Sequence, residues 1–506
     1  MLIVAVFSVV AAVLLRTKRP AAQVLRPPLF HWITITGIAL AVFIISAIGT
    51  KLVCHNYGLS ADENMADFQA RIFLRGKISA EVPEQWIPVV RLIKPTYVDY
   101  FPGSHSWKSA YLPVYAAMRT VFQRVGLQSL LNPFLAAVTV VAVWGATRNI
   151  WPNRPDIAFV AAALLAASSQ FLLMTMTAYS MPAHLALNSV WLWLYSSPDR
   201  RRFYAAPFAG VLAIGLHQPN VHILFVAPFL FRLLLDRRWR ATTIFGIVYA
   251  LGCAGWIAWR YYYLPATQAP TISYFRLLNP QMLIVQPMNL LLLIGWTSLA
   301  MPLLVVLGFS RIWRERPIVQ DAALSCLLTF GFYYFFYLDQ GHGWGYRYFH
   351  SALISLAVVA AAGWERLTEL VGQRLANQFV LSAVILSVFI QLPIRCYQAE
   401  RFVRPYALAA GTLGSLKTDL VALNPFQAWY SADLIRNDPF LEHKPIVVAV
   451  KPLSPEEART LRAAGTTHFA TPQELEQFGL ATRRYQNFDF DPFLLGRGPI
   501  DWFHSH

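Results

Sequence analysis

Charged residues are scarce in this chain of 506 residues. Only 13% of the sequence is Asp, Glu, Lys or Arg, whereas a soluble globular domain carries about 25%. Hydrophobic residues make up 56% of the chain and aromatic residues 14%. This composition excludes an ordinary soluble domain and indicates a polytopic membrane protein with aromatic residues at the membrane interfaces.

Acidic residues are the scarcer of the two charged classes. The chain has 26 Asp and Glu against 42 Lys and Arg, which gives a formal net charge of +16. The basic residues stand in short clusters between apolar runs and not on one face of a domain. This is the positive-inside pattern of membrane proteins, so we expect membrane lipids as partners and no nucleic acid.

Cysteine and recognisable metal motifs are also lacking. The four cysteines share no metal-ligand spacing, and two of them lie inside apolar segments. We therefore predict free thiols and no disulfide framework. The histidines do not form a His-Glu-x-x-His pattern, so no catalytic metal is predicted.

Apolar segments, in contrast, are abundant. Residues 1–15 have no leading positive charge, which predicts a retained helix and not a cleaved signal, so residues 1–31 form an extra N-terminal helix and a cytoplasmic turn. A second segment covers residues 32–50, and residues 32–394 are predicted to form a mainly α bundle of about 12 transmembrane helices. The later apolar segments lie near residues 131–147, 157–177, 184–195, 205–217, 220–235, 243–263, 288–308, 320–338, 350–364 and 377–394.

The turns between these segments alternate in charge. Arginine clusters fall on every second connection, which places them together in the cytoplasm. The connections between them, around residues 178–184, 217–220, 264–287 and 339–348, carry unusual polar clusters and few charges. We therefore predict that the polar clusters share the outer face of the membrane with the loop at residues 51–128.

Two regions are too polar to span a membrane. Residues 51–128 contain two stretches, 84–94 and 106–124, that interleave charged with aromatic and aliphatic residues, and we expect both to be helices in the plane of the interface. Residues 395–506 are predicted to form a soluble α/β domain outside the membrane. Its expected elements are a strand at 445–450, a helix capped by Ser454 and Glu457, a strand near 467–470 and a helix that begins after Thr471.

A pair of carboxylates, Asp62 and Glu63, begins the outer loop in this acid-poor sequence. A carboxylate can remove the proton from a hydroxyl group that attacks another molecule, which makes both residues catalytic candidates. The alternative is structural, since Asp and Glu are favoured in the first turn of a helix whatever its function.

Basic side chains on the same side of the membrane could bind a phosphate group. The strongest candidate is Arg347, which follows three glycines and stands at the start of an apolar segment. Its planar guanidinium can bind phosphate through two N–H groups, although an interface anchor would show the same pattern. The run lacks the spacing and the preceding strand of a nucleotide loop, which argues against NAD or ATP. Further candidates for phosphate binding are Tyr346, His342, Lys94, Lys108 and Arg71.

The turn His217-Gln218-Pro219-Asn220 lies between two segments that are short for a full crossing. Pro219 cannot continue a helix, and backbone groups freed within a membrane protein must face protein or water. The turn therefore predicts a polar substrate cavity lined by His217, Gln218 and Asn220.

Residues 32–365 resemble the GT-C superfamily of polyprenyl-phosphate-sugar-dependent glycosyltransferases, near the protein O-mannosyltransferase and aminoarabinose-lipid A transferase branch. The resemblance rests on the Asp62-Glu63 pair with its interfacial helices, the stretch Tyr100-Phe101-Pro102-Gly103, the turn at 217–220 and the run Gly-Trp-Gly-Tyr-Arg-Tyr at 343–348. It implies that Asp62 acts as the base or orients it, and that Arg347 contacts the donor phosphate. The turn at 178–182 carries no acid, in contrast to metal-dependent members.

The resemblance implies an inverting transferase that moves a sugar from a polyprenyl-phosphate donor to an acceptor hydroxyl, with the donor as co-substrate and no cofactor. The acceptor is left open between a glycan, a lipid and a protein. We expect the protein in a bacterial inner membrane, with its active site facing the periplasm. A flippase for lipid-linked sugars is the alternative, although the apolar segments after residue 131 are nearly free of acid.

Overall fold

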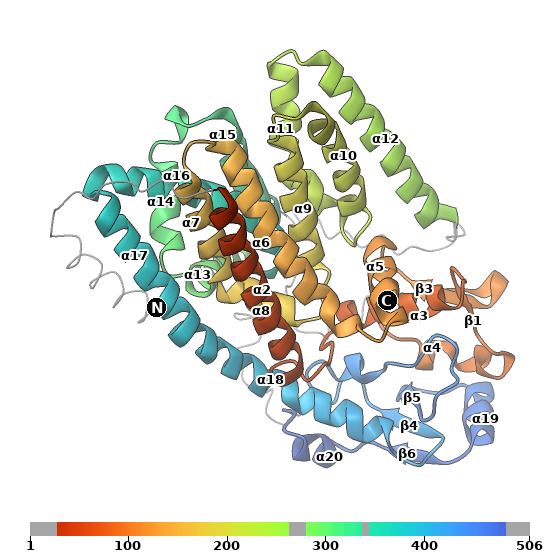
Figure 1. Ribbon diagram of the computed structural model, residues 1–506. Coiled ribbons are helices and arrows are strands. Elements are labelled where there is room, and N and C mark those ends of the chain that lie inside the picture. Colours follow the sequence, from red (N-terminus) through yellow and green to blue (C-terminus); the bar gives the residue numbers. More distant parts are fainter. Residues whose placement is uncertain (1–27, 263–279, 336–343, 482–506) are drawn as a thin grey trace.

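Helices dominate the fold of the protein. The structure is a computed structural model and describes residues 28–262, 280–335 and 344–481 (Figure 1). The predicted helix at residues 1–15 and the candidate His342 lie outside the described residues. The four cysteines are free thiols, as predicted.

A bundle of apolar helices forms the larger part of the molecule. α6 (Leu131–Ile150) packs between α2 (Pro28–Leu52) and α9 (Met181–Tyr195). Six described helices are long and apolar enough to cross a membrane, or up to eight if each bent pair is one span. These helices indicate an integral membrane protein. The other long helices are α10 (Arg200–Ile214), α11 (Pro219–Leu235), α12 (Trp239–Tyr262), α15 (Pro317–Phe335) and α16 (Leu353–Val371).

Two apolar segments that look continuous in the sequence are broken in the structure. The segment at 157–177 divides into α7 (Pro155–Ala166) and α8 (Ser169–Met176), which are bent by 56°. Ser168 causes this break, because its side chain caps α8 by accepting a hydrogen bond from the backbone of Phe171.

The second broken segment, at 288–308, consists of α13 (Met282–Trp296) and α14 (Met301–Phe309), which are bent by 116°. A break in the bundle leaves backbone groups that must find partners inside the protein. Gln391 supplies donors to the carbonyls of Gly295 and Thr297, at 2.9 and 3.1 Å, and the backbone N–H of Leu299 donates to Ser387.

One nearly continuous helix leads from the bundle to the C-terminal domain (Figure 1). α17 (Gln373–Leu386) passes through a π-helical turn at Ser387–Gln391 into α18 (Leu392–Gly414). The predicted boundary between residues 394 and 395 therefore falls inside a helix. The chain leaves helical structure only at Ser415, where hydropathy had already fallen.

The loop at residues 51–128, called the outer loop after its predicted side of the membrane, contains a small antiparallel sheet of order β1-β3-β2. In this sheet Tyr100 lies opposite Trp107. The prediction of one helix over residues 106–124 was wrong, since Ser106–Ser109 pairs as the central strand and the helix begins only at Val114. The other predicted helix, at residues 84–94, is helical but divided into two short pieces. The elements of the loop are α3 (Ala61–Leu74), β1 (Ala80–Glu81), η1 (Glu84–Val89), α4 (Val90–Ile93), β2 (Val98–Phe101), η2 (Pro102–Ser104), β3 (Ser106–Ser109) and α5 (Val114–Arg124).

The C-terminal domain is α/β, as predicted. Its parallel sheet has the order β5-β4-β6, and Ser454 and Glu457 form the expected capping box at the start of the first helix. The central strand β4 was missing from the prediction, because a run of four apolar residues directly after a helix gives no separate signal. The elements are β4 (Leu420–Leu423), β5 (Ile446–Ala449), α19 (Pro455–Ala464), β6 (Thr467–Phe469) and α20 (Pro472–Gln477).

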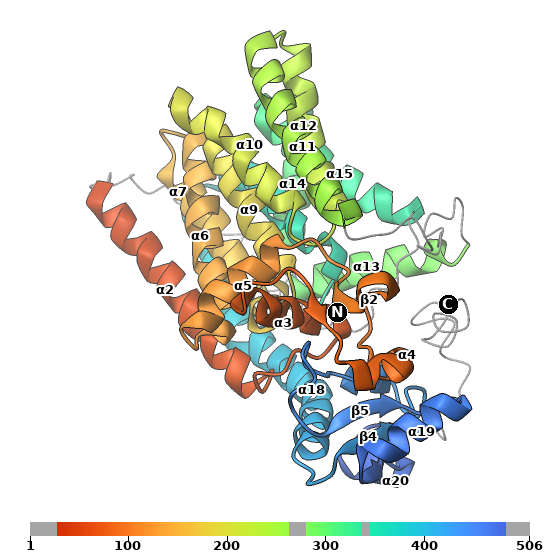
Figure 2. The same cartoon turned by 90° about the vertical axis from the view of Figure 1, so that its right-hand side faces the viewer.

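The outer loop and the C-terminal domain share one hydrophobic core. Trp107 of β3 is fully buried, and its indole N–H donates to the carbonyl of Pro439 at 2.7 Å. Leu420 and Ile446 from the C-terminal sheet pack in the same cluster as Phe68 of α3. Figure 2 shows this domain directly beneath α4 and the rest of the loop. Because burial here joins two distant parts of the sequence, the domain holds the loop in place.

Candidate active site

The two acids of the outer loop face different partners. Both lie in the first turn of α3, which Ser60 caps by accepting a hydrogen bond from the backbone of Glu63. The carboxylate of Glu63 accepts in return from the backbone of Ser60 at 3.1 Å and from that of Ala178 at 2.8 Å. These reciprocal bonds form a capping box. Glu63 therefore has the structural role at the start of a helix that was the alternative to catalysis. Burial raises the pKa of Glu63, and the two backbone donors oppose that effect.

Asp62 points to an arginine that is 285 residues away in sequence. Its Oδ2 lies 3.2 Å from Nη1 of Arg347, and its Oδ1 accepts a hydrogen bond from the hydroxyl of Tyr111. The Arg347 side chain is 7% exposed, and that of Asp62 18% exposed. An ion pair with so little solvent keeps most of its Coulombic attraction. The structure thus joins the two residues that the sequence ranked first.

Aromatic rings hold the guanidinium of Arg347 from two sides. Nη2 donates to the hydroxyl of Tyr348 at 3.1 Å, and the guanidinium carbon lies 4.8 Å from the centre of the Tyr179 ring. Cation–π contacts of this kind are strongest where water is excluded. Both tyrosines are buried, so they restrict the orientations that Arg347 can adopt.

The turn that carries Tyr179 is fixed by hydrogen bonds to its backbone. Asn132 of α6 donates to the carbonyls of Thr177 and Tyr179, at 2.7 and 2.8 Å, and Tyr115 donates to that of Ala178. Together with Glu63, these groups place the turn beneath the Asp62–Arg347 pair. No local signal in the sequence distinguishes Asn132 or Tyr115 as residues of this site.

Of the predicted cavity residues, His217 lies nearest to the pair. Its ring packs edge-on against that of Tyr111, with centroids 3.9 Å apart. Both ring nitrogens are buried and accept or donate no hydrogen bond within the described residues. Burial lowers the pKa of His217 to about 4, with nearby Asp62 opposing the shift. Buried ring nitrogens without a hydrogen-bond partner among the described residues are suited to a polar ligand.

The other two residues of the turn lie at the start of α11. Asn220 donates to the hydroxyl of Tyr333 at 3.3 Å, and the Tyr333 ring stacks on Tyr348 with centroids 5.1 Å apart. Asn220 therefore connects to Arg347 through two aromatic residues. Gln218 precedes α11, and its Oε1 is buried without a hydrogen bond in the part of the chain described here.

Tyr346 turns away from Arg347. Its hydroxyl donates to Gln286 at 3.0 Å, and its backbone N–H and carbonyl both bond to the side chain of Gln170. The preceding Gly345 has φ +85°, and a Cβ there would lie 2.4 Å from Oε1 of Gln170. Glycine is thus required for the close approach to Gln170, and this part of the run sets the position of Arg347 by its backbone.

The weaker basic candidates are not brought to the Asp62–Arg347 pair within the described residues. Lys94 donates to the carbonyl of Val98 at 2.6 Å, and the ammonium of Lys108 lies 5.2 Å from the Trp259 ring. Burial lowers the pKa of Lys108 to about 8. Arg71 lines a polar cavity of about 330 Å³ behind α3, which the ion-paired Asp67 and Arg119 also line.

Asp433, which no sequence pattern singled out, also reaches the site. It lies in the turn η7 (Ser431–Leu434) of the C-terminal domain, and its carboxylate lies near the backbone N–H of Ala61 at the start of α3. Arg436 fastens the same turn by donating to the carbonyl of Leu59 at 2.8 Å. Burial raises the pKa of Asp433 to about 7, an effect that nearby Arg436 opposes and Asp62 reinforces.

The described residues contain no group of three or more His, Cys, Asp or Glu that could hold a metal ion. The absence of a catalytic metal remains a prediction, as does the absence of a cofactor.

Comparison with solved structures identifies the architecture. ArnT from Cupriavidus metallidurans in the apo state aligns with a TM-score of 0.57 at 13% identity, over 88% of this chain and 90% of that one. The same protein bound to undecaprenyl phosphate aligns with a TM-score of 0.55 at 15% identity, over 88% and 89%. The chain has the GT-C fold.

The chain has no match among protein-family models or curated proteins. The alignment with ArnT extends over most of both chains, so it includes the C-terminal region as well as the helix bundle. The resemblance that the sequence suggested is therefore confirmed at the level of the fold.

Proposed function

We propose that the protein is an integral-membrane glycosyltransferase that moves a sugar from a polyprenyl-phosphate donor to an acceptor hydroxyl. The buried pair of Asp62 and Arg347 carries this proposal, because it joins a carboxylate and a cation where the outer loop meets the bundle. The GT-C fold supports it, since ArnT of that fold has been solved with undecaprenyl phosphate bound.

Asp62 is the proposed base. In an inverting displacement the acceptor oxygen forms a bond to the anomeric carbon while its proton passes to the carboxylate. The bond from that carbon to the phosphate oxygen breaks, and its electron pair leaves with the phosphate. Phosphate needs no general acid, so one carboxylate suffices for proton transfer.

Arg347 is the proposed contact for the leaving phosphate. A guanidinium binds phosphate through paired charge-assisted hydrogen bonds, which strengthen as negative charge develops on the leaving group. In the structure this guanidinium contacts Asp62, Tyr348 and Tyr179.

The ion pair suggests how donor binding prepares the base. A carboxylate paired with an arginine is a weak base, because the positive charge favours its ionised form. A donor phosphate competes with Asp62 for Arg347, so binding of the donor releases Asp62 to accept a proton. The base would then become active only when a donor is present.

Glu63 is assigned a positioning role, since both its oxygens bind backbone N–H groups. His217, Gln218 and Asn220 are proposed to line the space for the sugar or the acceptor. The contact of Asp433 with the start of α3 supports a contribution of the C-terminal domain to the site. We further propose that the site faces the outside of the membrane.

A donor-consumption assay tests the function. Purified wild type in lipid would meet a panel of polyprenyl-phosphate sugars, with a membrane extract as the source of acceptor. We expect wild type to consume one donor and Asp62→Asn to consume it at a rate about 10²–10⁴ times lower, the usual contribution of a general base.

The matched control is Asp156→Asn, which removes an acid that is ion-paired with Arg154 on the opposite side of the bundle. It should consume the donor at the wild-type rate. Full activity of Asp62→Asn would remove Asp62 from the mechanism. If wild type consumed no donor but moved labelled donor between the leaflets, the protein would be a flippase and not a transferase.

A further inference from the structure

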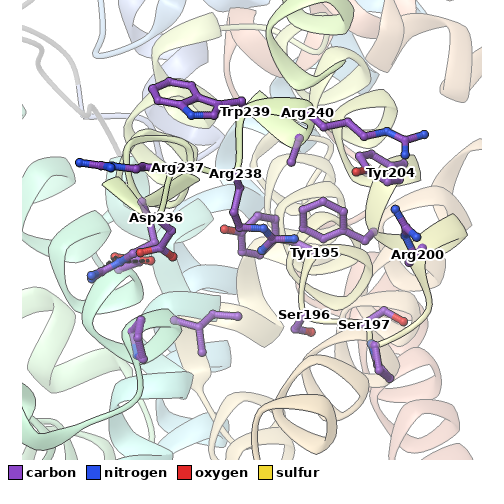
Figure 3. A pocket seen from close by; sticks show the side chains of 17 residues that line it. Tyr195, Ser196, Ser197, Arg200, Tyr204, Asp236, Arg237, Arg238, Trp239 and Arg240 are labelled. Atoms are coloured by element: carbon purple, nitrogen blue, oxygen red, sulfur yellow. Dashed lines mark hydrogen bonds and ion pairs between the residues drawn. The ribbon is translucent and has the colours of Figure 1, made fainter. Parts of the chain in front are cut away.

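A second polar site lies at the other end of the helix bundle. It is a cavity of about 850 Å³ between the α9–α10 turn, the α11–α12 turn and the start of α15. Figure 3 shows Arg238 in the middle of this cavity, with Arg200 and Arg240 to one side and Arg237 and Asp236 to the other.

The helices themselves show that the cavity is remote from Asp62. α10 begins at the cavity with Arg200 and ends at Ile214, just before His217. α11 begins at Pro219 and returns to the cavity at Asp236. Helices of 15 and 17 residues span about 22 to 25 Å at 1.5 Å per residue. In Figure 1 the α11–α12 turn lies at the end of the bundle opposite the C-terminal domain. The cavity therefore belongs to the other leaflet.

The charges that line the cavity do not balance. Five arginines and two aspartates line it, an excess of three positive charges. One arginine and one aspartate neutralise each other, since Arg232 binds Asp321 with Nη2–Oδ1 at 2.8 Å. The other four arginines form no ion pair with a carboxylate within the described residues. These four are Arg200, Arg237, Arg238 and Arg240.

The backbone adds to the positive potential. α12 and α15 both begin at the cavity, and the N-terminus of a helix carries a partial positive charge with N–H groups that can bind an anion. The N-terminus of α10 is already capped by Asp199, which accepts a hydrogen bond from the backbone of Arg201. The guanidinium of Arg238 lies 4.6 Å from the centre of the Phe203 ring, although Arg238 and the other three unpaired arginines are exposed to solvent. Four arginines gathered around one cavity can bind a single anion together.

The surface beside the cavity is apolar and exposed. Phe231 and Leu235 at the end of α11 are 58% and 59% exposed, and Trp239 at the start of α12 is 61% exposed. Only 11% of the apolar window of α12 is buried inside the protein. Exposed apolar side chains with a tryptophan at their edge are typical of a surface that faces lipid and its headgroups. A headgroup in the cavity would thus have its acyl chains along α11 and α12.

We propose that this cavity binds a phosphate-bearing anion, with the headgroup of an anionic phospholipid of that leaflet as the favoured source and a free phosphate as the alternative. Arg200, Arg238 and Arg240 provide the binding groups. The site is independent of the proposed transfer reaction, because none of its residues contacts the Asp62–Arg347 pair.

The test measures lipid retained by the full-length protein. Wild type in nanodiscs of phosphatidylcholine with a minor fraction of phosphatidylglycerol would be released and examined by native mass spectrometry for bound phosphatidylglycerol. We expect the triple variant Arg200→Gln, Arg238→Gln, Arg240→Gln to bind it about 100-fold more weakly, since each arginine near an anionic surface contributes roughly fivefold. Glutamine keeps much of the side chain, so packing over Phe203 is largely preserved.

A control variant removes the same number of charges outside the cavity, through Arg201→Gln, Arg314→Gln and Arg374→Gln. These exposed arginines do not line the cavity, and their loss should weaken retention less than fivefold. Equal losses in both variants would overturn the proposal in favour of general surface charge, as would equal retention of phosphatidylcholine and phosphatidylglycerol by wild type.

A second experiment distinguishes a lipid headgroup from a free phosphate as the bound anion. In it, inorganic phosphate competes with phosphatidylglycerol for the protein. Retention that survives millimolar phosphate assigns the site to the lipid headgroup. Displacement by phosphate at that concentration, lost in the cavity variant only, assigns it to a free phosphate. Failure of both ligands to bind in a folded wild-type protein overturns the site.

Discussion

Two aspartate–arginine pairs lie at the two ends of the helix bundle, and they differ in how completely each pair is closed. Asp321 binds Arg232 through Nε and Nη2, at 2.8 to 3.3 Å, and Gln320 accepts a further bond from the same guanidinium. Asp62 lies 3.2 Å from Nη1 of Arg347, and its other oxygen accepts a hydrogen bond from the hydroxyl of Tyr111.

The difference separates a structural pair from one that can exchange partners. A forked pair with bonds on both sides gains geometric stability and is costly to open. Asp62 also accepts a bond from Tyr111, and Arg347 also contacts Tyr348, so each keeps a neutral partner when another anion takes the place of the carboxylate. The pair near the outer loop is thus suited to a phosphate substrate, and the pair at the other end to stability.

The largest expected effect is on binding of polyprenyl phosphate, where substitutions of Arg347 and of Asp62 should act differently. Arg347→Gln should weaken binding of polyprenyl phosphate by about 10- to 100-fold, because it removes charge-assisted hydrogen bonds to the phosphate. Asp62→Asn should bind the same ligand at least as tightly as wild type, because it removes the competing anion. Microscale thermophoresis in detergent would measure both, and weaker binding by Asp62→Asn would break the competition model.

A smaller effect is expected when the forked pair is opened. Asp321→Asn removes the negative charge but keeps one acceptor, and it should lower the free energy of unfolding by about 2 kcal/mol. The same change at Asp62 should lower it by less, since the amide keeps an acceptor for the hydroxyl of Tyr111. Thermal unfolding of both variants in one detergent compares them, and equal loss of stability would contradict the contrast drawn here.

Next in size is the effect at Glu63. Glu63→Ala leaves the backbone N–H groups of Ser60 and Ala178 without this acceptor and should cost about 1–2 kcal/mol of stability. Glu63→Gln retains an acceptor oxygen and should cost less, with transfer activity reduced far less than in Asp62→Asn. If Glu63→Gln were as inactive as Asp62→Asn at normal stability, Glu63 would belong to the chemistry.

The effect expected for Asp433 is a dependence of stability on pH. Burial raises its pKa from 3.8 to about 7, so between about pH 4 and pH 7 the folded protein holds a proton that the unfolded chain has released. The free energy of unfolding should therefore fall as the pH rises through this window and level off above it. Asp433→Asn should remove this decline, as measured by unfolding temperature against pH. A decline of the same slope in the variant would exclude Asp433 as its source.

Much of the fold follows from local patterns in the sequence. Low charge and long apolar segments predicted a helix bundle, and Ser454 with Glu457 predicted the start of α19, because a capping box needs only residues three apart. The breaks at Ser168 and at residues 297–300 were not predicted. Both segments are uniformly apolar, and the partners that stabilise the second break, such as Gln391, come from far along the chain.

The sequence also identified the chemistry-bearing residues of the candidate site only in part. Asp62, Arg347 and His217 stand out because charged or polar groups are rare beside apolar segments. Lys94 and Lys108 were also chosen as charged residues near apolar segments, but they lie away from the Asp62–Arg347 pair. Such a choice depends on residue type and approximate depth in the membrane, and it contains no information on lateral position. Tyr111 and Asp433 stood out in no pattern, because tyrosines are common at membrane interfaces and Asp433 lies in an ordinary polar turn.

The sequence by itself thus determined the membrane character of the protein, the apolar segments, the small C-terminal α/β domain and a short set of candidate groups. These depend on composition and on residues a few positions apart. Tertiary structure alone decided that Asp62 meets Arg347 across 285 residues, that Glu63 is turned to the backbone, and that Asp433 reaches the start of α3. The physical reason is that such contacts depend on how helices and loops pack in three dimensions, which no local pattern of residues encodes.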